Sequence, residues 1–178
     1  MKSKYSVAIW LVAGTVLAGC DRHDASDVVT KSDMTNPAGA TASSPVAAAM
    51  RASVAEVRAG EPLEIAVQVR IKPGWHIYAV NRPAGSSLPT SIGLDLPAGV
   101  ERAGDWELPE AALEISTSDQ PRFIYTGDVE FRCRLRVSQD AQAGTLKLAG
   151  VLNFQACDRF SCQPPDSIPL ATEVRVVP

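Results

Sequence analysis

The chain has 178 residues, a formal net charge of −3 and an isoelectric point near 5.4. That length suits one ordinary domain with short appendages, and acidic and basic residues are interspersed without the basic patch that nucleic-acid binding requires. Thirteen prolines, twelve glycines and few helical patterns favour an all-β domain.

The first 19 residues have the features of a secretion signal. Lys2 and Lys4 precede an apolar run over residues 7–16 that is too short to span a membrane as a mature helix. The run leads into Leu17-Ala18-Gly19-Cys20, which resembles the lipobox of bacterial lipoproteins. That resemblance implies cleavage before Cys20 and attachment of lipid to it. An ordinary signal peptide with an incidental cysteine is the alternative.

Residues 20–51 are expected to form a flexible tether. From residue 21 to about residue 50 the chain is rich in Ala, Ser, Thr, Asp and Pro and has no hydrophobic period, so it cannot bury enough apolar surface to offset its conformational entropy. Asp21 resembles the inner-membrane retention signal of enteric lipoproteins. We therefore expect a protein anchored by lipid on the periplasmic face of the inner membrane, where disulfides persist.

Residues 52–178 carry the pattern of a β-domain. Apolar residues recur at every second position in the longer segments, with polar residues between them. The expected strands are 63–71, 75–78, 90–96, 113–116, 129–137, 145–156 and 168–177. About seven to nine short strands separated by turns predict an antiparallel, immunoglobulin-like β-sandwich. The Cys…Trp…Cys spacing of true immunoglobulin domains is absent.

Four cysteines divide into three kinds. Cys20 belongs to the lipobox. Cys133 falls on the apolar face of its strand, where a free cysteine behaves as a small hydrophobe, whereas three arginines occupy the opposite face. Cys157 and Cys162 are then the evident pair.

The cysteine pair lies in the stretch Phe154-Gln155-Ala156-Cys157-Asp158-Arg159-Phe160-Ser161-Cys162-Gln163-Pro164-Pro165. A tight loop between two strands can bring two Cα atoms within the roughly 4.4–6.8 Å that a disulfide needs. Closing so short a loop stabilises the fold by only about 2 kcal/mol, and its polar residues favour the exposure that thiol exchange requires. A redox-active pair and a structural surface disulfide both remain open. A zinc site is not supported, since no second cysteine pair or nearby histidine completes four ligands.

Two further segments precede the cysteine stretch, namely Pro73-Gly74-Trp75-His76-Ile77-Tyr78 and Ile124-Tyr125-Thr126-Gly127-Asp128-Val129. Together with Ile168-Pro169-Leu170, these segments resemble the N-terminal periplasmic domain of the thiol:disulfide interchange protein DsbD, the disulfide-bond corrector domain. The resemblance covers roughly residues 52–178. It implies an immunoglobulin-like domain with one redox-active cysteine pair and no metal or organic cofactor. Such a domain accepts electrons from a thioredoxin-like domain and passes them to periplasmic substrate proteins of the thioredoxin fold.

The resemblance also implies roles for individual residues. Cys162 matches the cysteine that forms mixed disulfides with partners, and Cys157 matches the resolving cysteine. The family shields the pair with a cap loop bearing an aromatic residue. In this chain the cap should fall within residues 122–127, with Phe123, Ile124 and Tyr125 as the candidates.

His76 and Tyr78 are two residues apart and should therefore share one face of a strand. They match aromatic positions that flank the active site of the family. His76 could assist thiolate formation, because a nearby imidazolium lowers the pKa of a cysteine. An ordinary half-exposed histidine is the alternative.

Two classes of function are compatible with these features. The first is a thiol–disulfide oxidoreductase that relays electrons through Cys157 and Cys162. The chain ends at Pro178 without the membrane and thioredoxin-like domains of full-length DsbD, so we expect a membrane electron donor to act in trans, with the tether raising its effective concentration. The second is a membrane-anchored adaptor whose disulfide is structural. A hydrolase is disfavoured, since the two histidines have no Ser/Asp setting.

Overall fold

The computed structural model describes residues 44–80, 87–114 and 121–178. These residues form β-strands and contain no helix, which confirms the predicted all-β, immunoglobulin-like fold. Within the same residues there is accordingly no helix long and apolar enough to cross a membrane. The expected signal sequence, Cys20, Asp21 and the tether up to residue 43 lie outside the described residues.

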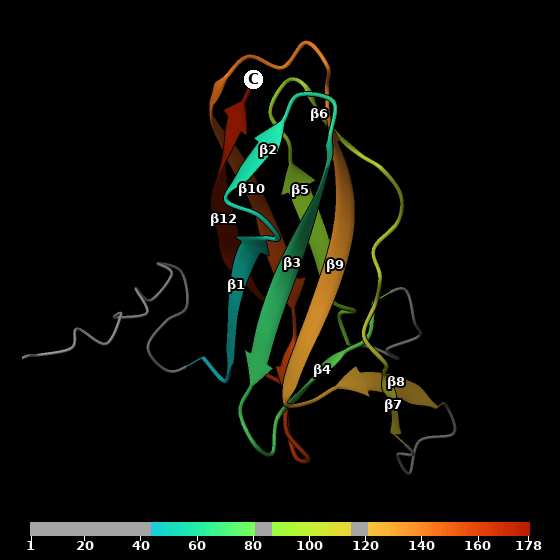
Figure 1. Cartoon of the computed structure of the whole chain (residues 1–178). Helices are drawn as coiled ribbons and strands as arrows, with labels where there is room; N and C mark the ends of the chain where they lie inside the picture. Colours follow the sequence, from blue (N-terminus) through green and yellow to red (C-terminus); the bar gives the residue numbers. More distant parts are fainter. Residues whose placement is uncertain (1–43, 81–86, 115–120) are drawn as a thin grey trace, which may run out of the picture. The chain divides into compact units, whose positions relative to one another are not determined.

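Two four-stranded sheets enclose the main core (Figure 1). The first sheet has the order β1 (Val46–Ala52), β3 (Pro62–Ile71), β9 (Asp128–Val137) and β6 (Val100–Arg102). The second has the order β2 (Glu56–Arg58), β12 (Asp166–Val177), β10 (Gly144–Phe154) and β5 (Ser91–Asp95). All pairings are antiparallel except that of β2 with β12.

The apolar residues that alternate along the long strands in the sequence are the residues whose side chains fill this core. In β9, Phe131, Cys133 and Leu135 are buried, whereas the arginines between them are exposed. In the facing sheet, β10 contributes Leu152 and Phe154 to the same cluster. Burying each large apolar side chain stabilises the fold by about 1.5–3 kcal/mol, so these strands hold the domain together.

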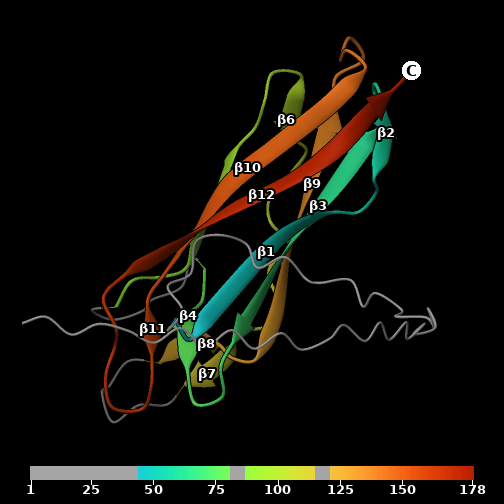
Figure 2. The same cartoon turned by 90° about the vertical axis from the view of Figure 1, so that its left-hand side faces the viewer.

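A third sheet of short strands lies at the end of the fold away from the C-terminus (Figures 1 and 2). Its order is β11 (Ala156–Cys157), β4 (His76–Tyr78), β8 (Arg122–Tyr125) and β7 (Ala112–Glu114). Gly74 precedes β4 and Gly127 follows β8, each with a positive φ, of 83° and 66° respectively. Glycine adopts that conformation without steric cost, and the two turns connect the third sheet to the long strands β3 and β9.

The first strand corrects one predicted boundary. Residues 46–51 were expected to belong to the tether, but β1 pairs with β3 from Val46 to Ala52. Val46, Ala48 and Met50 point into the core, so an alternation is present. Alanine carries too little apolar surface to reveal that alternation in the sequence, and pairing with β3 supplies the backbone hydrogen bonds.

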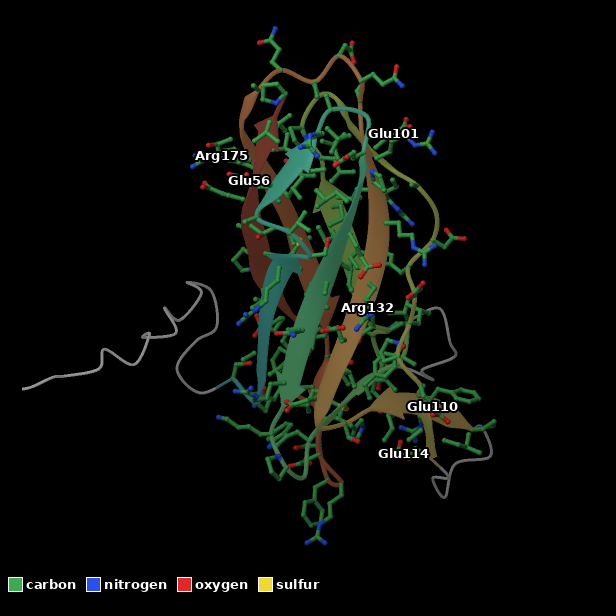
Figure 3. The ribbon with its side chains drawn as sticks, in the orientation of Figure 1. Glu56, Glu101, Glu110, Glu114, Arg132 and Arg175 are labelled. Carbon is green, nitrogen blue, oxygen red and sulfur yellow. A yellow bond between two sulfur atoms is a disulfide. The ribbon has the colours of Figure 1, made fainter. Side chains whose placement is uncertain are left out.

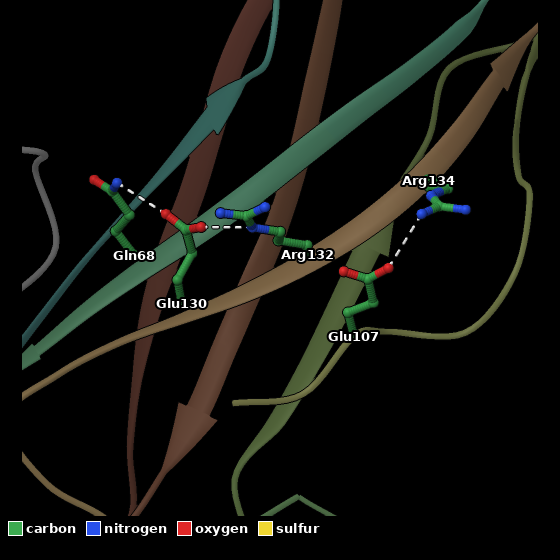
Figure 4. Close-up of polar contacts among 5 residues, drawn as sticks. All are labelled: Gln68, Glu107, Glu130, Arg132 and Arg134. Atoms are coloured by element: carbon green, nitrogen blue, oxygen red, sulfur yellow. Dashed lines mark hydrogen bonds and ion pairs between the residues drawn. The ribbon is translucent and has the colours of Figure 1, made fainter. Parts of the chain in front are cut away.

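The outer face of β3 and β9 is polar, as predicted, and several of its charges are paired. Gln68 Nε2 donates to Glu130 Oε2 at 3.1 Å, and Arg132 Nε donates to Glu130 Oε1 at 2.7 Å (Figure 4). These hydrogen bonds hold the pKa of Glu130 below its usual value. Arg134 Nη2 meets Glu107 Oε1 at 3.3 Å. Exposed pairs of this kind contribute about 0–1 kcal/mol each.

Candidate functional site

The two cysteines singled out in the sequence form a disulfide at the end of the third sheet. Cys157 ends β11 and Cys162 lies five residues later, with their Cα atoms 4.0 Å apart. Cys157 is 1% exposed, whereas Cys162 belongs to the exposed class. The two bonded cysteines therefore differ sharply in burial.

The pairing of the short strands gives the third sheet two different faces. Cys157 is the cross-strand partner of His76, and Tyr78 is the partner of Ile124. Since side chains alternate along a strand, these four residues share one face. Cys157 and Tyr78 form a small buried cluster of their own, and Ile124 packs against it. We call this face, made of His76, Tyr78, Cys157 and Ile124, the site face.

The opposite face of the same sheet belongs to the main core. Ile77, Ala156 and Tyr125 are buried there. The Tyr125 ring meets the Phe131 ring edge to face at 5.3 Å between centroids.

These two faces separate the three candidate cap residues. Ile124 lies on the site face, against the cluster that contains Cys157. Phe123 and Tyr125 pack with the main core instead. Of the three candidates, Ile124 is the one that the strand register brings to the buried cluster containing Cys157.

The loop between the cysteines is held by a single carboxylate. Asp158 Oδ1 accepts hydrogen bonds from the backbone N–H groups of Phe160 and Ser161, at 2.8 and 2.7 Å. These backbone hydrogen bonds lower the pKa of Asp158. Asp158 N also donates to Ser161 O at 2.9 Å. The result is a fixed turn that presents Phe160, 79% exposed, with the Arg159 guanidinium 4.4 Å from its ring centroid.

Two residues that the sequence did not single out, Gln155 and Ser87, make contacts at Cys162 or at its neighbour Gln163. Gln155 Oε1 accepts from Leu88 N at 2.9 Å, and Gln155 Nε2 donates to Gln163 O at 3.0 Å. Ser87 Oγ lies 4.0 Å from Cys162 Sγ. The only feature of the sequence that pointed to Gln155 was its place in the cysteine-containing stretch. Ser87 had no such feature, because its contact spans 75 residues of sequence.

His76 and Tyr78 are on the site face, as their spacing predicted. Their rings meet edge to face at 5.4 Å between centroids, and Arg122 Nη1 donates to the Tyr78 hydroxyl at 3.1 Å. His76 is 8% exposed, so it is more deeply buried than the half-exposed histidine of the alternative. Burial lowers the pKa of His76, with a smaller lowering effect from Arg122.

Two carboxylates act in the opposite direction on His76. Glu114 and, more weakly, Asp158 raise its pKa, but burial outweighs them. Figure 3 shows Glu114, the last residue of β7, at the end of the fold that carries the third sheet, whereas Glu101 of β6 lies towards the opposite end. Among the residues that the structure describes, no group of three or more His, Cys, Asp or Glu side chains is placed to hold a metal ion.

A family model decides the relationship of this chain to known proteins. The model described as thiol:disulfide interchange protein DsbD, N-terminal, matches residues 40–172, well over half of the chain. The chain belongs to this family. It therefore contains a thiol–disulfide exchange domain, and the cysteine pair of such a domain is present as a disulfide. The match begins before Val46, in agreement with the early start of β1.

Solved structures of the same family are similar to the chain at low identity. The N-terminal periplasmic domain of ScsB from Proteus mirabilis is 21% identical, with a TM-score of 0.44, over 68% of this chain and 44% of that one. The reduced N-terminal domain of DsbD from Neisseria meningitidis is 16% identical, with a TM-score of 0.41, over 71% and 82%. The chain thus spans less than half of the ScsB chain. No curated protein sequence matches this chain.

Proposed function

We propose that this protein is a periplasmic thiol–disulfide oxidoreductase that relays electrons between thioredoxin-fold partners through Cys157 and Cys162. The observation that carries the proposal is the asymmetry of the pair. One sulfur belongs to an exposed residue and the other to a residue that is 1% exposed. Exchange needs one accessible sulfur to meet a partner and a second, protected sulfur to resolve the mixed disulfide.

In the proposed reaction, a thiolate of a partner dithiol attacks Cys162 Sγ. A bond forms between the partner and Cys162 while the bond between Cys162 and Cys157 breaks. The electron pair leaves on Cys157, which takes up a proton. The second thiolate of the partner then attacks the first sulfur of the partner, which is bonded to Cys162 in the mixed disulfide, and this attack releases Cys162. The partner is oxidised and the pair is reduced by two electrons; the reverse sequence delivers those electrons to a substrate disulfide.

The local hydrogen bonds argue against a purely structural role for the disulfide. Asp158 N to Ser161 O, at 2.9 Å, and Gln163 N to Ala156 O, at 2.8 Å, already close the turn. The Asp158 carboxylate adds its own bonds inside the loop. A cross-link over so few residues adds only about 2 kcal/mol, so its contribution to holding this turn is small, which supports an exchange role.

The tip of the loop suits the docking of a partner protein. Phe160 projects into solvent beside Cys162 and carries the Arg159 cation on its ring. Aromatic and arginine side chains are the residues most often found to dominate protein–protein binding energies. Because the turn is held by Asp158, little conformational entropy is lost when this tip is covered.

Trapping of mixed disulfides tests the proposal. Cys157→Ala, made in a Cys133→Ala background so that Cys162 is the remaining thiol of the domain, should accumulate a stable adduct with a thioredoxin-fold protein in envelope extracts. Non-reducing electrophoresis and mass spectrometry detect it. Cys162→Ala in the same background should trap at least about tenfold less, since Cys157 is enclosed and exchange requires access.

The same experiment has an outcome that favours the adaptor hypothesis. If neither variant traps a partner and a thioredoxin-type dithiol fails to reduce the wild-type bond, the disulfide is structural. Cys133→Ala alone is the matched control, and it should behave as the wild type does.

We also propose that Cys20 is lipidated and holds the domain near a membrane-bound electron donor. The support is the lipobox-like segment Leu17-Ala18-Gly19-Cys20. Intact-mass analysis should find a mature chain that begins at a lipidated Cys20, and Cys20→Ser should leave the chain unprocessed or release it from membranes. An unmodified N-terminus at another residue would exclude the anchor.

A further inference from the structure

His76 has a buried nitrogen with no hydrogen-bond partner. Its Nε2 is enclosed, and among the described residues no donor or acceptor bonds to it. The side chain as a whole is only 8% exposed, so water does not readily replace a partner. A buried polar group left in this condition costs about 1–3 kcal/mol, and native structures usually avoid it.

Tyr78, whose ring is next to His76, does not supply the missing bond. The two rings meet edge to face at 5.4 Å between centroids. The Tyr78 hydroxyl already accepts from Arg122 Nη1 at 3.1 Å. Aromatic contact fixes the orientation of the imidazole but leaves Nε2 unsatisfied.

Cys157 is the cross-strand partner of His76. Directly opposed residues in an antiparallel pair have Cβ atoms about 4.5–5.5 Å apart on one face of the sheet. In the oxidised protein, Cys157 Sγ is bonded to Cys162 Sγ and carries no proton. The cysteine can therefore donate nothing to the imidazole in this state.

We propose that reduction of the disulfide supplies the missing partner, so that His76 forms a hydrogen bond with Cys157 in the reduced state only. Reduction by a partner dithiol adds two electrons to the pair, and each sulfur that becomes a thiol also takes up one proton. The new Cys157 Sγ–H then donates to an unprotonated Nε2; where Nε2 carries the ring proton, it donates to a Cys157 thiolate instead. His76 is thus a positioning residue that stabilises the reduced form. The inference rests on the proposed function, because it requires a reducible pair.

The groups packed around the imidazole are consistent with a neutral ring. Tyr78 lies on its own strand, Glu114 on β7, Arg122 on β8 and Asp158 just after β11. Burial lowers the pKa of His76 more than the two carboxylates raise it. A neutral imidazole has one nitrogen that accepts a hydrogen bond and one that donates, so either form of the proposed bond is open to it.

The reduction potential provides the first test, on the full-length protein equilibrated with glutathione. The fraction of closed Cys157–Cys162 bond is measured by alkylation and peptide mapping. His76→Phe keeps a ring but removes the nitrogen, and it should shift the equilibrium about tenfold towards the disulfide, which lowers the potential by about 30 mV. His76→Gln keeps a polar group and should recover part of the shift. His23→Phe makes the same substitution at the other histidine of the chain and is the matched control; it should leave the potential near that of the wild type.

A spectroscopic test needs no substitution and decides the matter if a variant fails to fold. The chain has two histidines, His23 and His76, so ¹⁵N labelling of histidine gives few signals, which a His23→Gln chain assigns. The Nε2 resonance of His76 should move towards its hydrogen-bonded value on reduction, while that of His23 stays unchanged. Unchanged His76 signals in a protein that is readily reduced would overturn this inference alone. A wild-type bond that resists a thioredoxin-type dithiol would overturn it together with the proposed function.

Discussion

Cys133 and Cys157 are equally buried, at 1% exposure each, yet they lie in regions built for different purposes. Cys133 sits in the middle of β9, opposite Ile65, inside the core between the two large sheets. Cys157 ends a two-residue strand and is bonded to the exposed Cys162. Burial alone therefore does not decide reactivity. What distinguishes Cys157 is its bond to a cysteine that belongs to the exposed class.

The surroundings of Cys133 make it a poor nucleophile. Burial is the main cause that raises the pKa of its thiol, and Sγ lies 3.6 Å from the carbonyl oxygen of Arg134. Because the thiolate is the species that attacks a disulfide, a raised pKa and a closed core both suppress exchange. The core of the two large sheets buries most of the large apolar side chains, whereas the third sheet carries the disulfide to which we assign the exchange reaction.

The separation of the core from the third sheet predicts its largest effect on the stability of the domain. Leu135 is 0% exposed and pairs with Leu63, well away from the third sheet in the strand register. Leu135→Ala should destabilise the domain by about 2–5 kcal/mol, through lost burial and the cavity left behind. Urea denaturation measures this, and exchange with a small dithiol at low temperature should stay at the wild-type rate. A folded Leu135→Ala protein that has lost exchange would show that the two regions are not separable.

The long strands were predictable because their alternation persists over many residues. In β3 and β12, apolar residues recur at every second position over enough residues to show which face of the strand is buried. β2 and β6 were not predicted, because three-residue strands such as Val100–Arg102 exist only through pairing with a longer neighbour. The family resemblance led us to expect a cap loop within residues 122–127, but Arg122–Tyr125 forms strand β8, which no alternation of polarity announces in the sequence. One face of β8 packs against the main core, and the other face packs against the cluster of Tyr78 and Cys157.

The candidate site was predictable only in part, for a similar reason. The cysteine spacing and the pairing of His76 with Tyr78 on one face are local properties, and the sequence shows them. The choice of Ile124 over its neighbours depends on the register of β8 against β4, which tertiary structure sets. The contacts of Gln155 with Leu88 and of Ser87 with Cys162 join segments that are distant in sequence, and no local pattern encodes such contacts.

The smaller effect expected from this separation concerns recognition, and it contrasts two exposed apolar side chains. Phe160 is 79% exposed at the tip of the cysteine loop, and Leu108 is 43% exposed in the connection between β6 and β7. Phe160→Ala should change stability by less than about 0.5 kcal/mol, as surface substitutions usually do. It should slow exchange with a thioredoxin-fold partner about tenfold, since truncating an aromatic anchor typically costs more than about 1 kcal/mol of binding.

The reagent used as the reductant separates docking from chemistry. A small dithiol has no surface to meet Phe160, so its rate with Phe160→Ala should equal the wild-type rate, whereas the rate with the protein partner falls. Leu108→Ala is the matched control and should leave both rates unchanged. Equal slowing with both reductants would mean that Phe160 acts on the disulfide itself, through the turn held by Asp158. Slowing with neither would mean that the partner approaches Cys162 without touching the tip. Only slowing confined to the protein partner assigns chemistry to the cysteine pair and recognition to the loop that carries it.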